Sequence, residues 1–332
     1  MSLYRAETRR LTKRRLTRIF VVLALLALTA VAAGTALISK QHTPQVLAAA
    51  QADADAAYQE QLRYTAEDKK RCEVDPAQYG GNCDNLWQPT QQDFPAESYL
   101  PPIFDFRDGF PDMVVVLAAL LALAAFVVGA SFVGVEWRTG GMMNLLLWRP
   151  QRLRVLSTKL AALLVGLTTL TVLTAAVWTV AFWAIGKYRG EVGRLTSGVW
   201  QSFGLTGLRA LGLVLVAGAL GFGLASIGRH TAAAFGVALG VVVVFQFGLG
   251  AVLEMAKVKF AQAYLLPYWI GAWMYKKQEV FDYNAPCDFS ATNGCEPPMF
   301  TITWQMAGGL MAGVVALVLI AAMWTMRSRD LT

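Results

Sequence analysis

Six long apolar segments with no charged residue near their centres restrict what this chain can fold into. They cover residues 19–38, 113–135, 160–185, 204–227, 231–253 and 300–326. A helix needs about 20 apolar residues to cross the roughly 30 Å hydrocarbon layer of a bilayer, and each segment is long enough. A charge at the centre of such a helix costs about 2.5 to 3.5 kcal/mol, so its absence favours insertion. We therefore predict an all-α integral membrane protein with six transmembrane helices.

The placement of charge predicts the orientation of these helices. Basic residues are concentrated in residues 1–18 and 136–159, and such clusters normally face the cytoplasm. The segments on that side contain three acidic residues, Glu7, Glu136 and Asp330, whereas the opposite side has more acidic than basic residues. We expect both termini, including a short tail at 327–332, in the cytoplasm. The basic face favours contact with anionic membrane lipid and argues against nucleic-acid binding.

The polar segments between the spans predict structure outside the membrane. Residues 39–112 are long for a connecting loop, so we expect an extracytoplasmic domain with a helix near 46–62. Residues 186–203 form a shorter outer loop. Residues 254–299 are rich in tyrosine and tryptophan around Pro267, which predicts a re-entrant or interface-lying helix.

All four cysteines fall in the predicted outer segments. Close spacing in an oxidising compartment favours disulfides joining Cys72 to Cys83 and Cys287 to Cys295. The alternative is four unpaired thiols. A zinc site is disfavoured, because neither pair has C-x-x-C spacing or a nearby histidine.

Residues 1–18 place a few apolar side chains, among them Leu3, Tyr4 and Leu11, in a segment dominated by arginine. This pattern is typical of an amphipathic helix lying at the membrane interface. The alternative is a run of charges that only sets topology.

The segment 136–159, which we call the elbow, carries the most specific motif. It begins Glu136-Trp-Arg-Thr-Gly-Gly, continues through Leu-Leu-Leu-Trp148-Arg-Pro-Gln-Arg and ends at Lys159. Small residues, Glu, Arg-Thr, Leu-Leu, Arg-Pro-x-Arg and then Lys before the next span resemble the permease subunits of ABC-2 type (type V exporter-like) transporters. The match is best over about residues 129–162, and elsewhere it depends on helix count and layout.

The resemblance implies a division of labour between polypeptides. Two ABC-type ATPase subunits would dock on the elbow and the N-terminal helix and would hold ATP and Mg²⁺. A second permease copy or a paralogue would complete the transporter, which would export its cargo across a bacterial plasma membrane as a multi-pass protein.

Residues of the elbow have side chains suited to docking a partner. Charged side chains can pair with the partner's charges and tryptophans can fill its apolar pockets. The candidates for ATPase coupling are Glu136, Trp137, Arg138, Trp148, Arg149 and Arg152. The alternative is that tryptophan and arginine next to a span are ordinary interface anchors.

Catalysis by this chain is not expected. ATP hydrolysis would need a phosphate-binding G-x-x-x-x-G-K-[ST] loop, and the sequence contains none. His42 and His230 lie on opposite sides of the predicted membrane, so they cannot share a metal or a relay. We predict a permease that is not an enzyme and binds no cofactor or metal itself.

A few polar residues inside the spans mark a candidate cargo path. They are, with their aromatic neighbours, Thr168, Thr171, Trp178, Phe245 and Gln246. A mainly apolar path with sparse hydroxyls would suit a hydrophobic or amphipathic small molecule or a lipid. Alternatively, the threonines bond to carbonyls of their own helix, and the glutamine bonds to a neighbouring helix.

Two other function classes stay open at this stage. The chain could be a membrane-anchored sensor or binding protein without transport activity. An ion-coupled secondary transporter is a further alternative, although such proteins usually place ionisable groups near the midplane. The glycine pairs Gly236/Gly240 and Gly309/Gly313 predict close helix packing, or a dimer interface.

Overall fold

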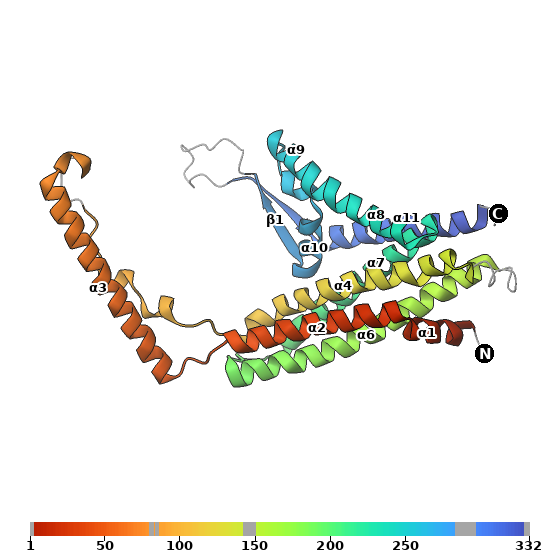
Figure 1. The fold of residues 1–332 in the computed structure, drawn as a ribbon, viewed down its shortest axis with the longest axis horizontal. Coiled ribbons are helices and arrows are strands. Elements are labelled where there is room, and N and C mark those ends of the chain that lie inside the picture. The colour runs from red at the N-terminus through yellow and green to blue at the C-terminus, as the bar shows by residue number, and fades with distance from the viewer. Residues whose placement is uncertain (1–2, 80–82, 84–85, 142–150, 283–296, 329–332) are drawn as a thin grey trace. The chain divides into compact units, whose positions relative to one another are not determined.

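The computed structural model describes residues 3–79, 83, 86–141, 151–282 and 297–328, and most of them are helical (Figure 1). The α-helices are α1 (Leu3–Lys13), α2 (Arg15–Ile38), α3 (Pro44–Val74), α4 (Phe106–Arg138), α6 (Arg152–Arg189), α7 (Ser197–Gly228), α8 (Thr231–Val241), α9 (Gly250–Met255), α10 (Leu266–Tyr275) and α11 (Trp304–Ser328). Short 3₁₀ helices are η1 (Pro76–Tyr79), η3 (Gln91–Asp93), η4 (Ala96–Tyr99) and η6 (Ala261–Tyr264), and η5 (Val242–Leu249) is a π-helix. The strands are β1 (Lys277–Phe281) and β2 (Met299–Thr303).

The chain divides into two compact units. The bundle unit comprises Met1–Ala30, Phe110–Val180 and Leu195–Thr332, and the α3 unit comprises Val31–Gly109 and Ala181–Arg194.

Within the described residues, six helices are long and apolar enough to cross a membrane, which confirms the predicted number. They are α2, α4, α6, α7, the continuous run Thr231–Met255 and α11. Several extend beyond their apolar segments into charged ends. Helix α6, for example, ends with Lys187 and Arg189 in its last turn, where cations interact favourably with the helix dipole.

The last span begins later than the sequence predicts. Residues 300–303 were expected to be helical, but they belong to strand β2, and α11 starts at Trp304. The reason is tertiary: β2 pairs antiparallel with β1, and Val280 and Ile302 are fully buried beside Ala272 and Ala307. A short apolar run followed by a helical one reads as a single span, because hydropathy alone cannot separate strand from helix.

Glycines bring α4 and α7 into backbone contact. A Cβ added at Gly129 would overlap the carbonyl oxygen of Gly218, and one at Gly221 would overlap that of Phe126. The predicted packing glycines behave differently: a Cβ at Gly236, Gly240, Gly309 or Gly313 meets nothing within 4 Å. Close packing within this chain therefore uses glycines other than the two predicted pairs.

The segment between the fifth and sixth spans contains the short helix that its aromatic content predicted. Helix α10 has Pro267 in its first turn, where a missing backbone N–H carries no cost. The indole of Trp273 donates to the backbone carbonyl of Arg209 in α7 at 2.8 Å. Within the bundle unit, helix α10 and the β1–β2 hairpin thus pack against α7 and α11.

The α3 unit is built around one long helix. Thr43 caps α3, its hydroxyl accepting a hydrogen bond from the Val46 N–H, and Pro44 follows in the first turn. The helix continues well beyond the predicted 46–62, to Val74. A disulfide joins Cys72 near its end to Cys83, which confirms that predicted pair. Cys287 and Cys295 lie outside the described residues.

Candidate functional site

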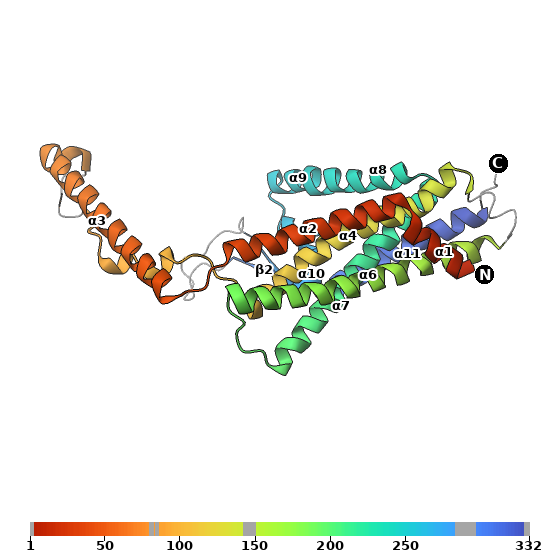
Figure 2. The ribbon, with the colours of Figure 1, turned by 60° about the horizontal axis from the view of Figure 1, so that its bottom comes forward.

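Several segments that the sequence assigns to partner docking meet at one end of the bundle unit. In both views, α1, the Arg138 end of α4, the Arg152 end of α6 and the Ser328 end of α11 lie at the same end (Figure 1 and Figure 2). The elbow therefore leaves and re-enters the bundle beside the N-terminal helix.

A network of buried charges, which we call the ion cluster, joins these segments. It consists of Glu7 of α1, Arg14 between α1 and α2, Glu136 of α4 and Lys159 of α6. The Lys159 ammonium lies 2.5 Å from Oε2 of Glu7 and 2.6 Å from Oε2 of Glu136. Arg14 pairs with the other carboxylate oxygen of Glu136 and donates to the Ser131 carbonyl at 3.0 Å. Lys159 therefore bridges two carboxylates, Glu7 and Glu136, that lie far apart in the sequence.

Burial makes the ion cluster energetically important. Lys159 and Glu7 are fully buried, and Glu136 is 8% exposed. The ring of Phe132, also buried, lies under both cations, 5.0 Å from the Arg14 guanidinium carbon and 5.1 Å from the Lys159 nitrogen. Desolvation lowers the pKa of Arg14, and the nearby carboxylates of Glu136 and Glu7 oppose that shift. Removing one member would leave an uncompensated buried charge.

The N-terminal helix packs into the bundle unit through one face. Glu7 and Leu11, one turn apart, are the buried residues among its described side chains, whereas Tyr4 is exposed. A Cβ on Gly166 of α6 would lie 2.9 Å from a methyl group of Leu11, so α1 rests directly against α6. Glu7, one of the two residues that hold this helix against the bundle, is acidic, so a search for apolar residues on one helix face does not identify it.

The predicted coupling residues have different environments. Glu136 points into the protein and belongs to the ion cluster. Trp137 is half-buried under the Arg229 guanidinium, whose carbon lies 4.9 Å from the ring centre. Arg138 is exposed and Arg152 is half-buried, while Trp148 and Arg149 lie outside the described residues.

Sequence reasoning did not select Glu7, Arg14 or Lys159 as site residues. A signal was present, because Glu7 and Glu136 are two of the three acidic residues in the otherwise basic predicted cytoplasmic segments. An acid that departs from such a strong charge bias indicates a specific partner.

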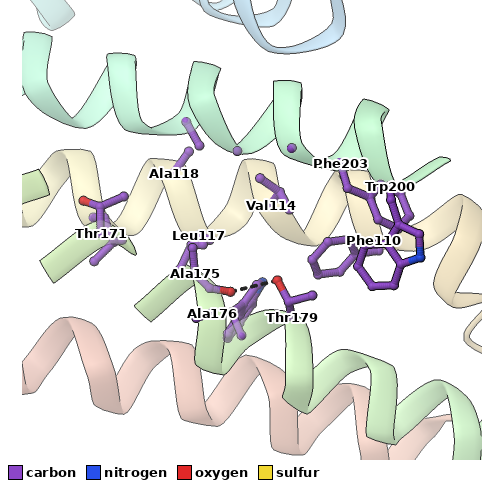
Figure 3. A pocket seen from close by; sticks show the side chains of 15 residues that line it. Phe110, Val114, Leu117, Ala118, Thr171, Ala175, Ala176, Thr179, Trp200 and Phe203 are labelled. Atoms are coloured by element: carbon purple, nitrogen blue, oxygen red, sulfur yellow. Dashed lines mark hydrogen bonds between the residues drawn. The ribbon is translucent and has the colours of Figure 1, made fainter. Parts of the chain in front are cut away.

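The membrane-spanning part of the bundle unit contains an apolar cavity, which we call the aromatic cavity. Its volume is about 280 Å³, and it lies among α4, α6 and α7. Phe110, Trp200 and Phe203 gather at one end and Thr171 lies at the other (Figure 3). The ring centres of Phe110 and Phe203 are 4.9 Å apart. Trp178 also lines the cavity, and its indole donates to the Met113 carbonyl at 3.0 Å.

A second cavity, which we call the Arg18 cavity, adjoins the first. Its volume is about 260 Å³, and residues of α1, α2, α4, α6 and α7 line it. Its polar lining residues are Thr12, Thr17, Arg18 and Thr171. Leu121 and Thr171 line both cavities.

The residues predicted to line a cargo path lie in different parts of the structure. Thr171 and Trp178 line the aromatic cavity, whereas the Thr168 hydroxyl donates to the Leu164 carbonyl of its own helix. Phe245 is about half exposed. Gln246 lines a different cavity of about 630 Å³, together with Glu254 and Tyr268. The five residues therefore do not form one surface.

Comparison with known proteins places this architecture in a family. A search of curated proteins found no significant match. A family profile described as "ABC-2 family transporter protein" matches residues 1–322, nearly the whole chain. The six membrane-spanning helices agree with a multi-pass transport component rather than a catalytic subunit. The chain belongs to the ABC-2 family of transporter proteins, the membrane permease components that work with an ABC ATPase.

Proposed function

We propose that this chain is the permease subunit of an ATP-driven exporter for a hydrophobic or amphipathic small molecule or lipid. The observation that carries the proposal is the ion cluster. Its ion pairs connect the N-terminal helix to α4 and α6, the two helices at the ends of the elbow. The segments expected to meet the ATPase should therefore move together. The family match supports an ABC ATPase as the partner.

Force from the partner would be transmitted through the elbow and the helices that the ion cluster joins. Two ATPase subunits, holding ATP and Mg²⁺, would close below the permease and push on the elbow. Because Lys159 links α1, α4 and α6, a displacement of the elbow would move these helices together. Helices α4 and α6 line both apolar cavities, so their movement would change access to them. A second permease copy or a paralogue would complete the transporter.

Orientation follows from charge and from the disulfide. The basic N-terminus and elbow lie at one end of the bundle unit, as the positive-inside rule favours for a cytoplasmic face. The Cys72–Cys83 disulfide favours an oxidising compartment for the α3 unit. We therefore place both termini in the cytoplasm and the α3 unit outside a bacterial plasma membrane.

Co-purification with an ATPase tests the proposal directly. The full chain, isolated in mild detergent from its native host, should retain a soluble Walker-motif ATPase. Arg138→Glu should weaken this association about tenfold without lowering thermal stability, because Arg138 is exposed at the elbow. Arg327→Glu is the matched control, since Arg327 is an exposed arginine at the end of α11.

Glu136→Gln should behave differently from Arg138→Glu. It removes a member of the ion cluster, so it should lower the melting temperature as well as uncouple ATPase activity from transport. A stable chain that binds no ATPase would support an anchored sensor instead. Transport that survives ATP depletion and stops when an ion gradient is collapsed would support a secondary transporter.

A further inference from the structure

The two apolar cavities differ in chemistry at the ends away from the residues that they share. The Arg18 cavity begins at a cation and two hydroxyls, Thr12 and Thr17, while the aromatic cavity ends at Trp200 and Phe203. Among the described residues Arg18 forms no ion pair, and its Nε donates to the Thr12 carbonyl at 3.0 Å. A positive group at the mouth of an apolar cavity is suited to an anionic head with a long apolar body.

Thr171, at the junction of the cavities, has an unpartnered hydroxyl. The other threonines of α6 all donate to carbonyls of that helix: Thr158, Thr168, Thr169, Thr174 and Thr179. The Thr171 hydroxyl finds no partner among the described residues, although the residue is only 4% exposed. Leaving such a group unsatisfied costs about 1–3 kcal/mol, so a ligand oxygen at this point would be stabilising.

Thr17 shows the same feature at the other end. Its hydroxyl oxygen is buried and has no partner among the described residues. Thr17 precedes Arg18 in α2, and both line the Arg18 cavity. A head group bound to Arg18 would therefore also have a hydroxyl available to it.

The dimensions favour one elongated ligand. Small-molecule sites usually have volumes of about 300–1,000 Å³, and each cavity alone falls just below that range. Joined at Leu121 and Thr171, they fall within it. The α6 lining runs from Gly166 to Thr179, which at 1.5 Å per residue is roughly 20 Å.

We propose that the two cavities form a single site, within one permease copy, for a long-chain anionic amphiphile. Its carboxylate or phosphate head pairs with Arg18 and Thr17. Its apolar body passes Leu121 into the aromatic cavity and carries an oxygen that accepts a hydrogen bond from Thr171. This site deepens the proposed function by naming a ligand class, and it rests on that function for the membrane setting.

The aromatic end of the site is open at two glycines of α7. A Cβ added at Gly204 or Gly207 would meet nothing within 4 Å, and both residues line the cavity. A larger side chain there would fill the cavity without displacing backbone. Gly236 of α8 has the same free space, does not line either cavity, and provides a matched control.

Photolabelling in lipid nanodiscs tests the site on the full chain, with any subunits that co-purify. The probe is palmitic acid with a mid-chain diazirine, and labelled peptides are mapped by mass spectrometry. We expect saturable labelling around Leu121 and Thr171, several-fold above the labelling of α8, whose Leu239 and Val237 are exposed. Arg18→Gln should reduce it about tenfold, and the methyl ester of the probe should label as weakly.

Matched variants separate the site from general lipid contact. Arg9→Gln, which removes an exposed arginine of α1, and Gly236→Leu should label like the wild type. Gly204→Leu should remove labelling in the aromatic cavity. Equal labelling of α8 and the cavity peptides, or equal effects of Arg18→Gln and Arg9→Gln, would overturn the proposal.

The role of Thr171 is tested by competition. A mid-chain hydroxystearic acid should displace the probe about tenfold better than stearic acid in the wild type and in Thr168→Val. Thr171→Val should abolish this preference. Equal competition in the wild type, or a preference that survives Thr171→Val, would refute the ligand oxygen. The assay uses no ATP, so its failure is distinct from a failure to bind an ATPase.

Discussion

At the scale of single residues, Lys159 lies at the centre of the ion cluster. It neutralises two carboxylates that approach from α1 and α4, and it is fully buried. Such an arrangement is weak evidence for net stability, because desolvation opposes the Coulomb attraction. It is strong evidence that the stability of the protein is sensitive to substitutions in the ion cluster, because each buried charge is balanced by the charges of the other members.

Lys159→Met should therefore destabilise the protein by roughly 3–5 kcal/mol, the usual cost of removing one partner from a buried ion pair. Adding Glu7→Gln should recover part of the loss, since it removes a buried carboxylate that would keep only Arg10 as an ion-pair partner. Melting followed by size-exclusion fluorescence measures both effects. Lys13→Met, at an exposed position of α1, is the control, and a Lys159→Met melting curve equal to the control's would contradict the ion cluster.

Tyr275 provides a pH-dependent contact between α10 and α4. Its hydroxyl donates to Oδ1 of Asp112 at 2.9 Å, and burial, followed by this hydrogen bond, raises the pKa of Tyr275 above its usual value of 10.0. A raised folded-state pKa means that the stabilisation is complete below the unfolded value and is lost as pH rises through the folded value.

We expect Tyr275→Phe to remove a phenol that titrates above pH 10. The difference in phenolate absorbance between wild type and variant, followed during an alkaline titration, measures this. Asp112→Ala removes the acceptor of this hydrogen bond, so it should lower the titration midpoint of Tyr275. An unchanged midpoint in Asp112→Ala would contradict the assigned contact.

Local sequence pattern identified Glu136 but could not identify its role. The motif marked it as a partner-facing charge, whereas its side chain pairs with Arg14, 122 positions earlier in the chain, and with Lys159. Pairings of that separation leave no periodic signal. The same limit applies to Thr171 and Thr168, which the local sequence does not distinguish, although the Thr168 hydroxyl donates to a carbonyl and the Thr171 hydroxyl has no partner among the described residues.

At the scale of elements, the six spans were predictable because length and apolarity are sufficient for insertion. The ends of helices and the β1–β2 hairpin were not, because they depend on pairing between segments. The Cys72–Cys83 disulfide was predictable from compartment and spacing, and the compartment follows from the topology derived from charge. Which glycines mediate packing was not predictable, since a small residue permits a close approach without specifying the neighbour.

Gly221→Ala should be destabilising, whereas Gly236→Ala should be neutral or slightly stabilising. The added methyl group at Gly221 would overlap the Phe126 carbonyl and force α4 and α7 apart, at a typical cost of about 1–3 kcal/mol. At Gly236 the added methyl group enters free space and lowers the conformational entropy of the unfolded chain. Thermal melting of the two variants in the same detergent measures the difference, and equal melting temperatures would refute the close contact of α4 with α7.

At the scale of the whole molecule, α1 links the ion cluster to the cavities. Glu7 belongs to the ion cluster, while Leu11 and Thr12, one turn further on, line the Arg18 cavity. A shift of α1 therefore changes the ion cluster and the cavity wall together. This geometry lets a partner acting on the elbow influence the proposed ligand site without touching it.

The direction of this coupling depends on the membrane orientation, which single-cysteine labelling determines. In a Cys287→Ser/Cys295→Ser background, Gln59→Cys on the exposed surface of α3 should react with a membrane-impermeant maleimide in intact cells. Arg9→Cys on α1 should react only after permeabilisation, because a basic N-terminus is retained in the cytoplasm. The bridged Cys72 and Cys83 do not react, so the background variant gives the blank. Labelling of Arg9→Cys in intact cells would place the ion cluster outside, where no ATPase could act on it.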